Sequence, residues 1–370
     1  MKVLHLLASG GTGGIEVLCK NIIERADWDN RICCLLDEGK IYEELKHQNK
    51  NVFSLKSENR NKKAIVNKLV NYCQKEKIDI VTVHHGGLSC NLIYIMLKKR
   101  LPNIKYVRYL HGCFDKYSFG NDGNIVKRIL IKKVMQHAFN ISDLLIFISK
   151  AVKTSFDNTF NIKDKNSVII YNGIDEKFYE KPLLKKEKSS FNNIIFVGRL
   201  SYVKGVDLLI DAFNQIQEIN SNVKLTIVGD GEEKQNLMAK TKQLGLQDKI
   251  YFAGRQSNVI DWLDKADVFV YPSIWQEGFG ISVVEAMARG CIPITFNNGG
   301  LPEIIEDGKN GFLVNKMTPT VLADTILKVL NIKSRDDIIN NDINTASRFS
   351  ITNTIKSLKK EYEKISKREK

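Results

Sequence analysis

The stretch Gln276–Ala288 reads QEGFGISVVEAMA, a glycine-broken polar loop that runs into a helix of good helix formers. It sets one carboxylate, Glu277, in the loop and another, Glu285, about a turn inside the expected helix. A helix N-terminus has unpaired backbone N–H groups and a partial positive charge, so it favours an anion such as phosphate. Two carboxylates nearby can accept hydrogen bonds from hydroxyl groups. The stretch suits a nucleotide-sugar, although a Glu near the start of a buried helix also has a purely structural interpretation.

The composition is that of a globular protein, with 43% apolar and 26% charged residues, and at 370 residues two domains are the default. No apolar run approaches the roughly 18 residues of a membrane span, and the N-terminus opens directly into a predicted strand. The seven cysteines show neither CxxC pairs nor His-linked spacing. We therefore expect reduced thiols of a cytoplasmic protein and no metal site.

The net charge of +14 is unevenly distributed. Residues 1–190 hold 33 Lys and Arg against 20 Asp and Glu, whereas residues 191–370 hold 23 against 22. A basic half indicates an anionic partner, such as lipid headgroups, nucleic acid or an acidic substrate. A generally Lys-rich composition with solvated faces is the alternative explanation.

Short apolar runs, among them Ile80–Val83, Lys105–Leu110 and Ser167–Tyr171, alternate with helical patterns along the chain, which predicts parallel sheets built from βαβ units. Pro182 and the run KKEKSS at 185–190 indicate a linker, after which the alternation restarts with a helix expected after each strand. We predict an α/β fold of two Rossmann-like domains, 1–185 and 186–350, that face each other across a cleft, because such folds bind ligands beyond the carboxyl ends of their strands. A helix at 351–370 is expected to return to the first domain.

Three loops after predicted strands offer groups that bind phosphate or sugar. Residues 9–14, SGGTGG, open a helix, but they fit neither the GxGxxG register of a dinucleotide site nor a P-loop. Residues 196–205, FVGRLSYVKG, carry Arg199 and Lys204, two cations that suit a pyrophosphate and the charge that develops as a bond to it breaks. His111 can hydrogen-bond a sugar hydroxyl or a phosphate, act in proton transfer, or serve a structural role.

In this order the motifs resemble the retaining glycosyltransferases of family four, which have the GT-B architecture of two Rossmann-like domains. The resemblance extends from Gly10 to the helix after Glu303. It rests on the Gly-rich loop, His-Gly, Gly-Arg-x5-Gly, Glu-x7-Glu, Gly-Gly-x-x-Glu, and the segments YNGID at 171–175 and IVGDG at 227–231. Single motifs of this kind are weak, but seven in order are specific.

The resemblance implies a role for each matching residue. Arg199 and Lys204 would stabilise the leaving nucleoside diphosphate, Glu277 would contact the donor sugar near its anomeric centre, and His111 would reach that sugar from the first domain. The other matching positions would bind the nucleotide-sugar: Glu285 at the ribose hydroxyls, Arg255 by the base, Phe279, Gly280 and Ile281 through backbone groups, and Gly13, Gly14, Gly198 and Gly229 along the donor.

The implied function is transfer of a hexose-type sugar from a nucleotide-sugar, with UDP favoured over GDP. The acceptor would be a glycan or lipid-linked molecule in the synthesis of bacterial capsule, exopolysaccharide or lipopolysaccharide. We expect retention of configuration on one face of the sugar. We expect neither a metal ion nor another cofactor, because Arg199 and Lys204 can supply the positive charge and no DxD motif follows a strand.

Residues 127–135, KRILIKKVM, have the pattern of a basic amphipathic helix, which favours peripheral association with the inner face of the cell membrane. An ordinary surface helix is the alternative. Three other functions stay open: a nucleotide-sugar hydrolase or epimerase of the same fold, a Rossmann oxidoreductase, and a non-enzymatic polyanion-binding protein. The oxidoreductase lacks its dinucleotide fingerprint, and because no nucleic-acid-binding motif appears we expect no nucleic-acid partner.

Overall fold

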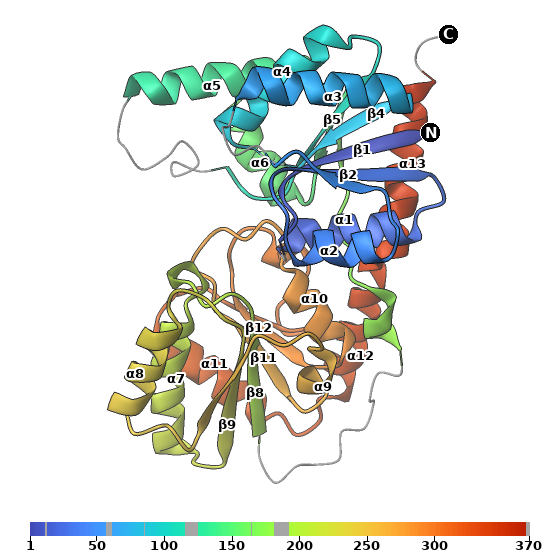
Figure 1. Ribbon diagram of the computed structural model, residues 1–370. Helices are drawn as coiled ribbons and strands as arrows, with labels where there is room; N and C mark the ends of the chain where they lie inside the picture. Colours follow the sequence, from blue (N-terminus) through green and yellow to red (C-terminus); the bar gives the residue numbers. More distant parts are fainter. Residues whose placement is uncertain are drawn as a thin grey trace. The chain divides into compact units, whose positions relative to one another are not determined.

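The computed structural model describes residues 1–11, 13–56, 61–84, 86–114, 125–163, 165–180 and 192–367. The chain forms two compact units (Figure 1). The first comprises Met1–Gly173 together with Ile351–Lys370, and the second comprises Ile174–Ser350. Each unit is built on one parallel sheet with helices against it, which confirms the predicted α/β class.

The first unit alternates strands and helices from its first residues. Its elements are β1 (Lys2–Ser9), α1 (Gly14–Arg25), β2 (Asp29–Asp37), α2 (Lys40–His47), β3 (Val52–Ser54), α3 (Lys62–Glu76), β4 (Ile80–Val83), α4 (Leu88–Arg100), β5 (Lys105–Leu110), α5 (Ile125–Asn140), β6 (Leu144–Phe147), α6 (Lys150–Asp157), β7 (Ser167–Ile169) and α13 (Ile351–Ser366). The sheet has the order β3-β2-β1-β4-β5-β6-β7. Helices α3, α4 and α5 cover one face, and α1 and α2 the other (Figure 1). Strands covered on both faces are largely apolar, and every residue of β4 and β6 is buried, including Thr82 of β4.

Helix α13 belongs to the first unit although it follows the second unit in sequence. Tyr362 is fully buried, and its hydroxyl lies 3.0 Å from Thr82 Oγ1 on β4. The Thr354 hydroxyl donates to the carbonyl oxygen of Tyr171 at 2.8 Å. These contacts bind the end of the chain to the first sheet.

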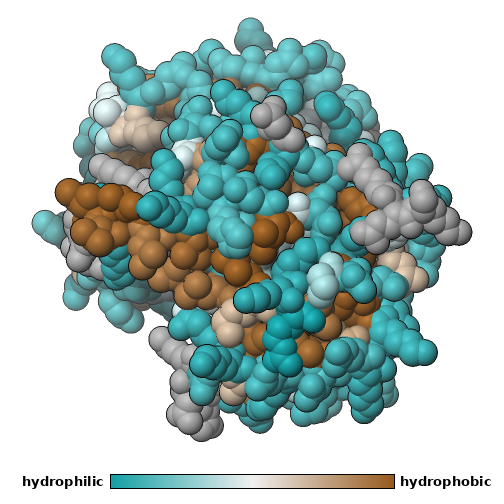
Figure 2. Space-filling model, turned by 90° about the horizontal axis from the view of Figure 1, so that it is seen from above, coloured by the Kyte–Doolittle hydropathy of each residue, from teal (hydrophilic) through white to brown (hydrophobic). Residues whose placement is uncertain are grey.

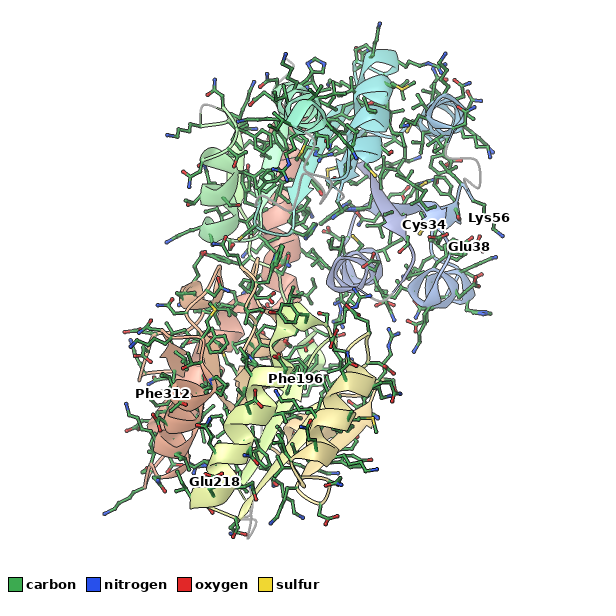
Figure 3. The ribbon with its side chains drawn as sticks, turned by 90° about the vertical axis from the view of Figure 1, so that its left-hand side faces the viewer. Cys34, Glu38, Lys56, Phe196, Glu218 and Phe312 are labelled. Carbon is green, nitrogen blue, oxygen red and sulfur yellow. The ribbon has the colours of Figure 1, made fainter. Side chains whose placement is uncertain are left out.

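The second unit repeats the same organisation. Its elements are η2 (Glu176–Tyr179), β8 (Asn192–Val197), η3 (Tyr202–Lys204), α7 (Val206–Ile219), β9 (Val223–Val228), α8 (Lys234–Gln243), β10 (Ile250–Gly254), α9 (Ile260–Leu263), β11 (Val268–Tyr271), α10 (Ile281–Ala288), β12 (Ile292–Phe296), η4 (Leu301–Glu303), β13 (Phe312–Val314), α11 (Pro319–Leu330), α12 (Asp336–Ala346) and η5 (Ser347–Phe349). The parallel sheet has the order β10-β9-β8-β11-β12-β13. Phe196 of β8 is fully buried in the interior of this unit (Figure 3).

The unit boundary differs from the predicted one. The Lys-rich run favoured a change at 185/186, but the second unit already begins at Ile174. The reason is that η2 packs there: the Tyr179 hydroxyl donates to Ala346 O at 2.8 Å, and Arg289 donates to Glu180 O at 2.7 Å. The predicted linker at 181–191 lies outside the described residues.

The expected helix after every strand is also wrong at β12, which is followed by the short turn η4 and then by β13. Strand β13 pairs with β12 in the sheet, and the loop that joins these two strands contains Gly299 and Gly300. Among the described residues, none of the helices has the length and apolar character needed to cross a bilayer.

Candidate active site

The segments that follow β8 and β11 bring Lys204 and Glu277 together. Lys204 Nζ donates to Glu277 Oε1 and to the Tyr271 hydroxyl, each at 2.6 Å. The Tyr271 hydroxyl lies 3.3 Å from the same carboxylate oxygen, and Ser273 Oγ donates to it as well. One oxygen of Glu277 therefore has three donors around it, which fixes the position of the carboxylate.

The pair is partly shielded from water, with side-chain exposures of 20% for Lys204 and 14% for Glu277. Burial alone lowers the pKa of Lys204, but the Tyr271 hydroxyl and the Glu277 carboxylate outweigh it and hold that pKa above its ordinary value. Burial raises the pKa of Tyr271 to about 12. At neutral pH the cluster holds a lysine cation beside a neutral phenol.

Glycines allow the surrounding loops to pack backbone against backbone. Gly205 has a φ of +63°, and a Cβ atom there would lie 2.1 Å from Pro272 O. Gly229 has a φ of +148°, and a Cβ atom there would lie 1.8 Å from Gly198 O. Residues with side chains cannot approach so closely, so glycine is required where the loops after β8, β9 and β11 meet.

Helix α10 begins directly after the loop that carries Glu277. Its N-cap is Gly280, with a φ of +108°, and Ile281 is its first residue. Because glycine offers no side chain to cap the helix, the first N–H groups of α10 suit an anion. Phe279 is buried, with its ring 5.2 Å from the ring of Phe349, and so anchors the loop to the interior of the unit.

Glu285 lies in the second turn of α10 and is partly buried. Burial raises its pKa to about 7; Lys177 acts in the opposite direction and Asp175 adds to the rise. A carboxyl group with this pKa is about half protonated at neutral pH. It can thus accept a hydrogen bond as a carboxylate or donate one as an acid.

The other predicted residues of the second unit stand at neighbouring strand ends. Arg199 follows β8, its side chain is 75% exposed, and its Nε lies 4.0 Å from Glu232 Oε2. The structure thus pairs Arg199 with Glu232, and Lys204 with Glu277. Arg255 follows β10 near Asp230, whose pKa is lowered first by the Gly231 N–H, then by Lys234, and to a smaller extent by Arg255.

The predicted residues of the first unit lie at the carboxyl edge of its own sheet. Gly13 is the N-cap of α1, which begins at Gly14, and a Cβ atom on Gly13 would lie 2.5 Å from a carboxylate oxygen of Glu16. An anion at this helix end would require Glu16 to turn away, since like charges repel. His111 follows β5, and its Nε2 lies 2.9 Å from Nδ1 of His84.

Two residues of the Glu277 cluster were not predicted from the sequence. Tyr271 ends β11 and Ser273 follows it by two positions. In the sequence they could be recognised only as two residues with hydroxyl groups at the end of a predicted strand. Rossmann-like domains bind ligands at the sheet edge where such strands end. Both donate to Glu277, so both belong to the candidate site.

Comparison with known proteins identifies two family profiles in the chain. "Glycosyltransferase Family 4" matches residues 12–178, and "Glycosyl transferases group 1" matches residues 176–345. An uncharacterized glycosyltransferase of Methanocaldococcus jannaschii is 32% identical over 303 residues, covering 80% of this chain and 78% of the relative.

Relatives with assigned activities include two bacterial enzymes. N-acetyl-alpha-D-glucosaminyl L-malate synthase of Bacillus anthracis is 29% identical over 313 residues, covering 82% of this chain and 78% of the relative. Lipopolysaccharide 1,2-N-acetylglucosaminetransferase of Salmonella typhimurium is 26% identical over 278 residues, covering 70% of this chain and 66% of the relative.

Among solved structures, Anabaena HepE in complex with UDP matches with a TM-score of 0.85 at 23% identity, covering 98% of this chain and all of that one. At this identity the likeness concerns the fold, and it confirms the predicted GT-B class.

Substitution of Gly205 tests the backbone contact that positions Lys204. We expect Gly205→Ala to lower the free energy of unfolding by about 3 to 5 kcal/mol, since the new methyl group meets Pro272 O in addition to the strain of a positive φ. The control is Gly245→Ala, also at positive φ (+69°) but with open space around it, for which we expect about 1 kcal/mol. Urea unfolding measures both, and equal losses would contradict the contact.

Glu285 should make stability depend on pH. Its folded pKa of about 7 lies above the ordinary value of 4.5, so between these pH values the folded state holds the extra proton. Stability therefore falls as pH rises through this window, by on the order of 3 kcal/mol, and then levels off. In Glu285→Gln this decline should be absent. Glu218→Gln, an exposed residue at the end of α7, should retain it (Figure 3). Identical pH profiles of Glu285→Gln and the unsubstituted protein, measured by urea unfolding, would refute the assignment.

Proposed function

The chain belongs to glycosyltransferase family 4, and we propose that it is a retaining enzyme that moves a hexose-type sugar from a UDP-sugar to a glycan or lipid-linked acceptor in cell-surface polysaccharide synthesis. The acceptor hydroxyl replaces the nucleoside diphosphate at the anomeric carbon. We place the protein in the cytoplasm, peripherally bound to the inner face of the membrane.

The observation that carries this proposal is the Lys204–Glu277 cluster ahead of α10. A departing nucleoside diphosphate gains negative charge as the glycosidic bond breaks, and a cation held in a partly dry site stabilises that charge more than water does. Lys204 is such a cation, held by two contacts of 2.6 Å. The uncapped start of α10 adds backbone N–H donors for phosphate.

Glu277 complements the cation. Its Oε1 receives hydrogen bonds from Lys204, Tyr271 and Ser273, so its carboxylate keeps one orientation without needing substrate. A carboxylate fixed in this way can orient sugar hydroxyls and stabilise positive charge near the anomeric carbon, where an oxocarbenium-like state develops. The acceptor hydroxyl attacks the anomeric carbon on the face that the diphosphate leaves and gives its proton to the leaving phosphate, so the configuration is retained without an enzyme nucleophile.

The relatives support the donor and acceptor classes. HepE was solved with UDP. One relative is named for the synthesis of N-acetyl-alpha-D-glucosaminyl L-malate, and another is a lipopolysaccharide N-acetylglucosaminetransferase. Positive charge at the leaving group comes from Lys204 and Arg199 in this proposal, so the reaction requires no metal ion. Arg199 is exposed, which leaves its guanidinium accessible to a diphosphate.

Helix α5 supports membrane association. Its first two turns expose four large apolar side chains, Ile125 (71%), Val126 (76%), Ile129 (51%) and Leu130 (56%), and Lys127, Lys132 and Lys133 are exposed on the same helix. The far side of α5 is buried through Ile131, Met135, Ala138 and Phe139. Figure 2 shows the resulting apolar surface over this part of the first unit, bordered by hydrophilic side chains.

The binding free energies that these side chains can contribute favour an anionic lipid surface as the partner. Each large apolar side chain contributes about 1.5 to 3 kcal/mol when it leaves water, and each Lys near an anionic surface about 1 kcal/mol. The exposed side chains of α5 thus offer several kcal/mol, enough for reversible binding. The excess positive charge of the first half of the chain, 33 basic against 20 acidic residues, acts in the same direction.

Loss of Lys204 should abolish most of the turnover. We expect Lys204→Ala to lower kcat at least about 100-fold and Arg199→Ala to lower it by a similar factor, because the leaving diphosphate loses a cation. The matched control is Lys240→Ala, which breaks a 2.6 Å ion pair with Asp211 elsewhere in the second unit and should leave turnover unchanged. The measurement is UDP release from UDP-glucose, UDP-galactose and UDP-N-acetylglucosamine, with EDTA present to test metal independence. Undiminished rates in Lys204→Ala would remove the proposed role.

The same assay separates transfer from the alternative activities. Release of UDP only when an acceptor is present indicates transfer, and equal release without acceptor indicates a hydrolase. A change of sugar configuration with no UDP released indicates an epimerase. Binding of none of the UDP-sugars, with binding of GDP-sugars in a thermal-shift screen, would correct the nucleotide.

Membrane association predicts salt-sensitive flotation with vesicles that contain phosphatidylglycerol. The double variant Ile129→Glu/Leu130→Glu should bind at least about tenfold more weakly, since it replaces apolar contacts with charges that anionic lipid repels. Ile219→Glu is the control, because Ile219 is even more exposed (72%) but lies on α7 of the second unit. Failure of the unsubstituted protein to float would end this part of the proposal.

A further inference from the structure

Four side chains form a continuous hydrogen-bonded chain across neighbouring strands of the first sheet. Nε2 of His5 lies 3.1 Å from Oδ1 of Asn30, Nδ1 of His5 lies 2.9 Å from Nε2 of His84, and Nδ1 of His84 lies 2.9 Å from Nε2 of His111. Asn30 is on β2 and His5 on β1, and His84 and His111 follow β4 and β5. The order β2-β1-β4-β5 in the sheet is the order of the chain of contacts, which we call the imidazole chain.

The backbone fixes the direction of the hydrogen bonds at one end. Asn30 Nδ2 lies 3.1 Å from the carbonyl oxygen of Trp28. A carbonyl oxygen only accepts, so the NH₂ group of Asn30 must face Trp28 and its Oδ1 must face His5. Because Oδ1 also only accepts, Nε2 of His5 carries a proton and donates it to Asn30.

The protonation state of His5 fixes the direction of the next hydrogen bond, the one between His5 and His84. His5 is fully buried, and burial lowers its pKa to about 4, while the Asn30 contact raises it only in part. At neutral pH the ring is therefore neutral and has a single N–H group, which is already assigned to Nε2. Its Nδ1 accepts, so the donor of the 2.9 Å contact is Nε2 of His84.

The same argument applies at His84, which is only 3% exposed. Its neighbours include Cys19 and Tyr109, and burial raises the pKa of both well above their ordinary values, so both are neutral. A cation in such surroundings would lose its hydration, which favours the neutral ring. With its proton on Nε2, His84 accepts at Nδ1, and His111 donates from Nε2.

We propose that the imidazole chain holds His111 in the neutral Nε2–H form, so that every hydrogen bond made by its Nδ1 is one that it accepts. The substrate group that His111 recognises is then a hydroxyl, which can donate, and not a phosphate, which repels a lone pair. This assignment rests on the proposed function, because it presumes that His111 contacts the sugar substrate. Asn30, His5 and His84 are positioning residues that act through His111.

A metal ion is the competing explanation for part of the chain. The ligand atoms of His5, Cys19 and His84 lie within 4.8 Å of one another. Two ring nitrogens that share a proton at 2.9 Å cannot both offer a lone pair to a metal, however, and the other nitrogen of His5 is held by Asn30. The hydrogen-bonded description accounts for the contacts of both ring nitrogens of His5, and burial keeps the thiol of Cys19 protonated.

Nitrogen NMR of ¹⁵N-histidine-labelled, ligand-free protein tests the assignment directly, since the two ring nitrogens of each tautomer have different shifts. At neutral pH we expect the neutral Nε2–H pattern for His111 and His84. His47, exposed at the end of α2, serves as the internal reference for a histidine free to exchange tautomers. An Nδ1–H pattern or a cationic ring at His111 or His84 overturns the proposal, as does metal found in the purified protein together with loss of the pattern on chelation.

A remote substitution distinguishes the chain from local packing. Asn30→Leu removes the terminal acceptor three hydrogen bonds from His111, and we expect the His111 signals to move toward a mixture of tautomers. His84→Phe, which removes the adjacent acceptor, should do the same and provides a second route if Asn30→Leu does not fold. Unchanged His111 signals in a folded variant would refute the relay.

Kinetics then tests the consequence for substrate. His84→Phe should lower kcat/KM for the UDP-sugar about tenfold, the size expected for one weakened hydrogen bond, and should leave the affinity for UDP alone unchanged, because UDP lacks the hydroxyls of the transferred sugar. Equal loss of UDP affinity would show that His111 contacts phosphate. The NMR result does not depend on catalysis, so an intact Nε2–H pattern in a protein without transferase activity would refute the proposed function and leave the tautomer assignment standing.

Discussion

The contact between Lys204 and Glu277 depends first on the close approach of two backbone segments and only then on the two charges. An ion pair that is partly removed from water loses hydration on both sides, and it is stable only where good geometry and further hydrogen bonds compensate. Tyr271 and Ser273 supply those hydrogen bonds to the same carboxylate oxygen. All four side chains come from two segments, and these meet because Gly205 lets one backbone approach Pro272 of the other.

The sequence predicted most of the secondary structure, because strands buried on both faces leave a continuous apolar signal. Two predicted strands, Ile80–Val83 and Lys105–Leu110, have the same bounds as β4 and β5. The strands that were missed, β3 and β13, have only three residues each; β7 is equally short but lies within the longer apolar run Ser167–Tyr171. The unit boundary was placed too late because charge and proline content mark a polar segment, whereas the packing of η2 decides where the second unit begins.

The candidate site was predicted as a set of residues but not as a set of contacts. Loop position and residue type were enough to single out Lys204, Glu277 and Glu285. Residues that meet come from distant parts of the sequence: Lys204 and Glu277 are 73 positions apart, and in the first unit His5 and His84 are 79 apart. A single sequence contains no information on such pairs beyond the topology of the sheet. The raised pKa of Glu285 is likewise a consequence of burial, which becomes visible only in the folded unit.

The two clusters, one in each unit, follow from the same property of parallel sheets. Side chains that follow neighbouring strands emerge at one edge, so residues far apart in sequence meet there in the order of the strands. In the second unit this edge unites the segments after β8 and β11, which are adjacent in the sheet, and yields a fixed carboxylate beside a cation. In the first unit it aligns β2, β1, β4 and β5 and yields a line of neutral rings whose protons have one direction. Neutral groups determine the state of the final polar group in both: two hydroxyls donate to Glu277 and orient it, and one amide oxygen, which accepts from His5, sets the proton on His111 through two imidazoles. In our proposal the charged group stabilises the leaving diphosphate, and the neutral one accepts a hydrogen bond from a hydroxyl.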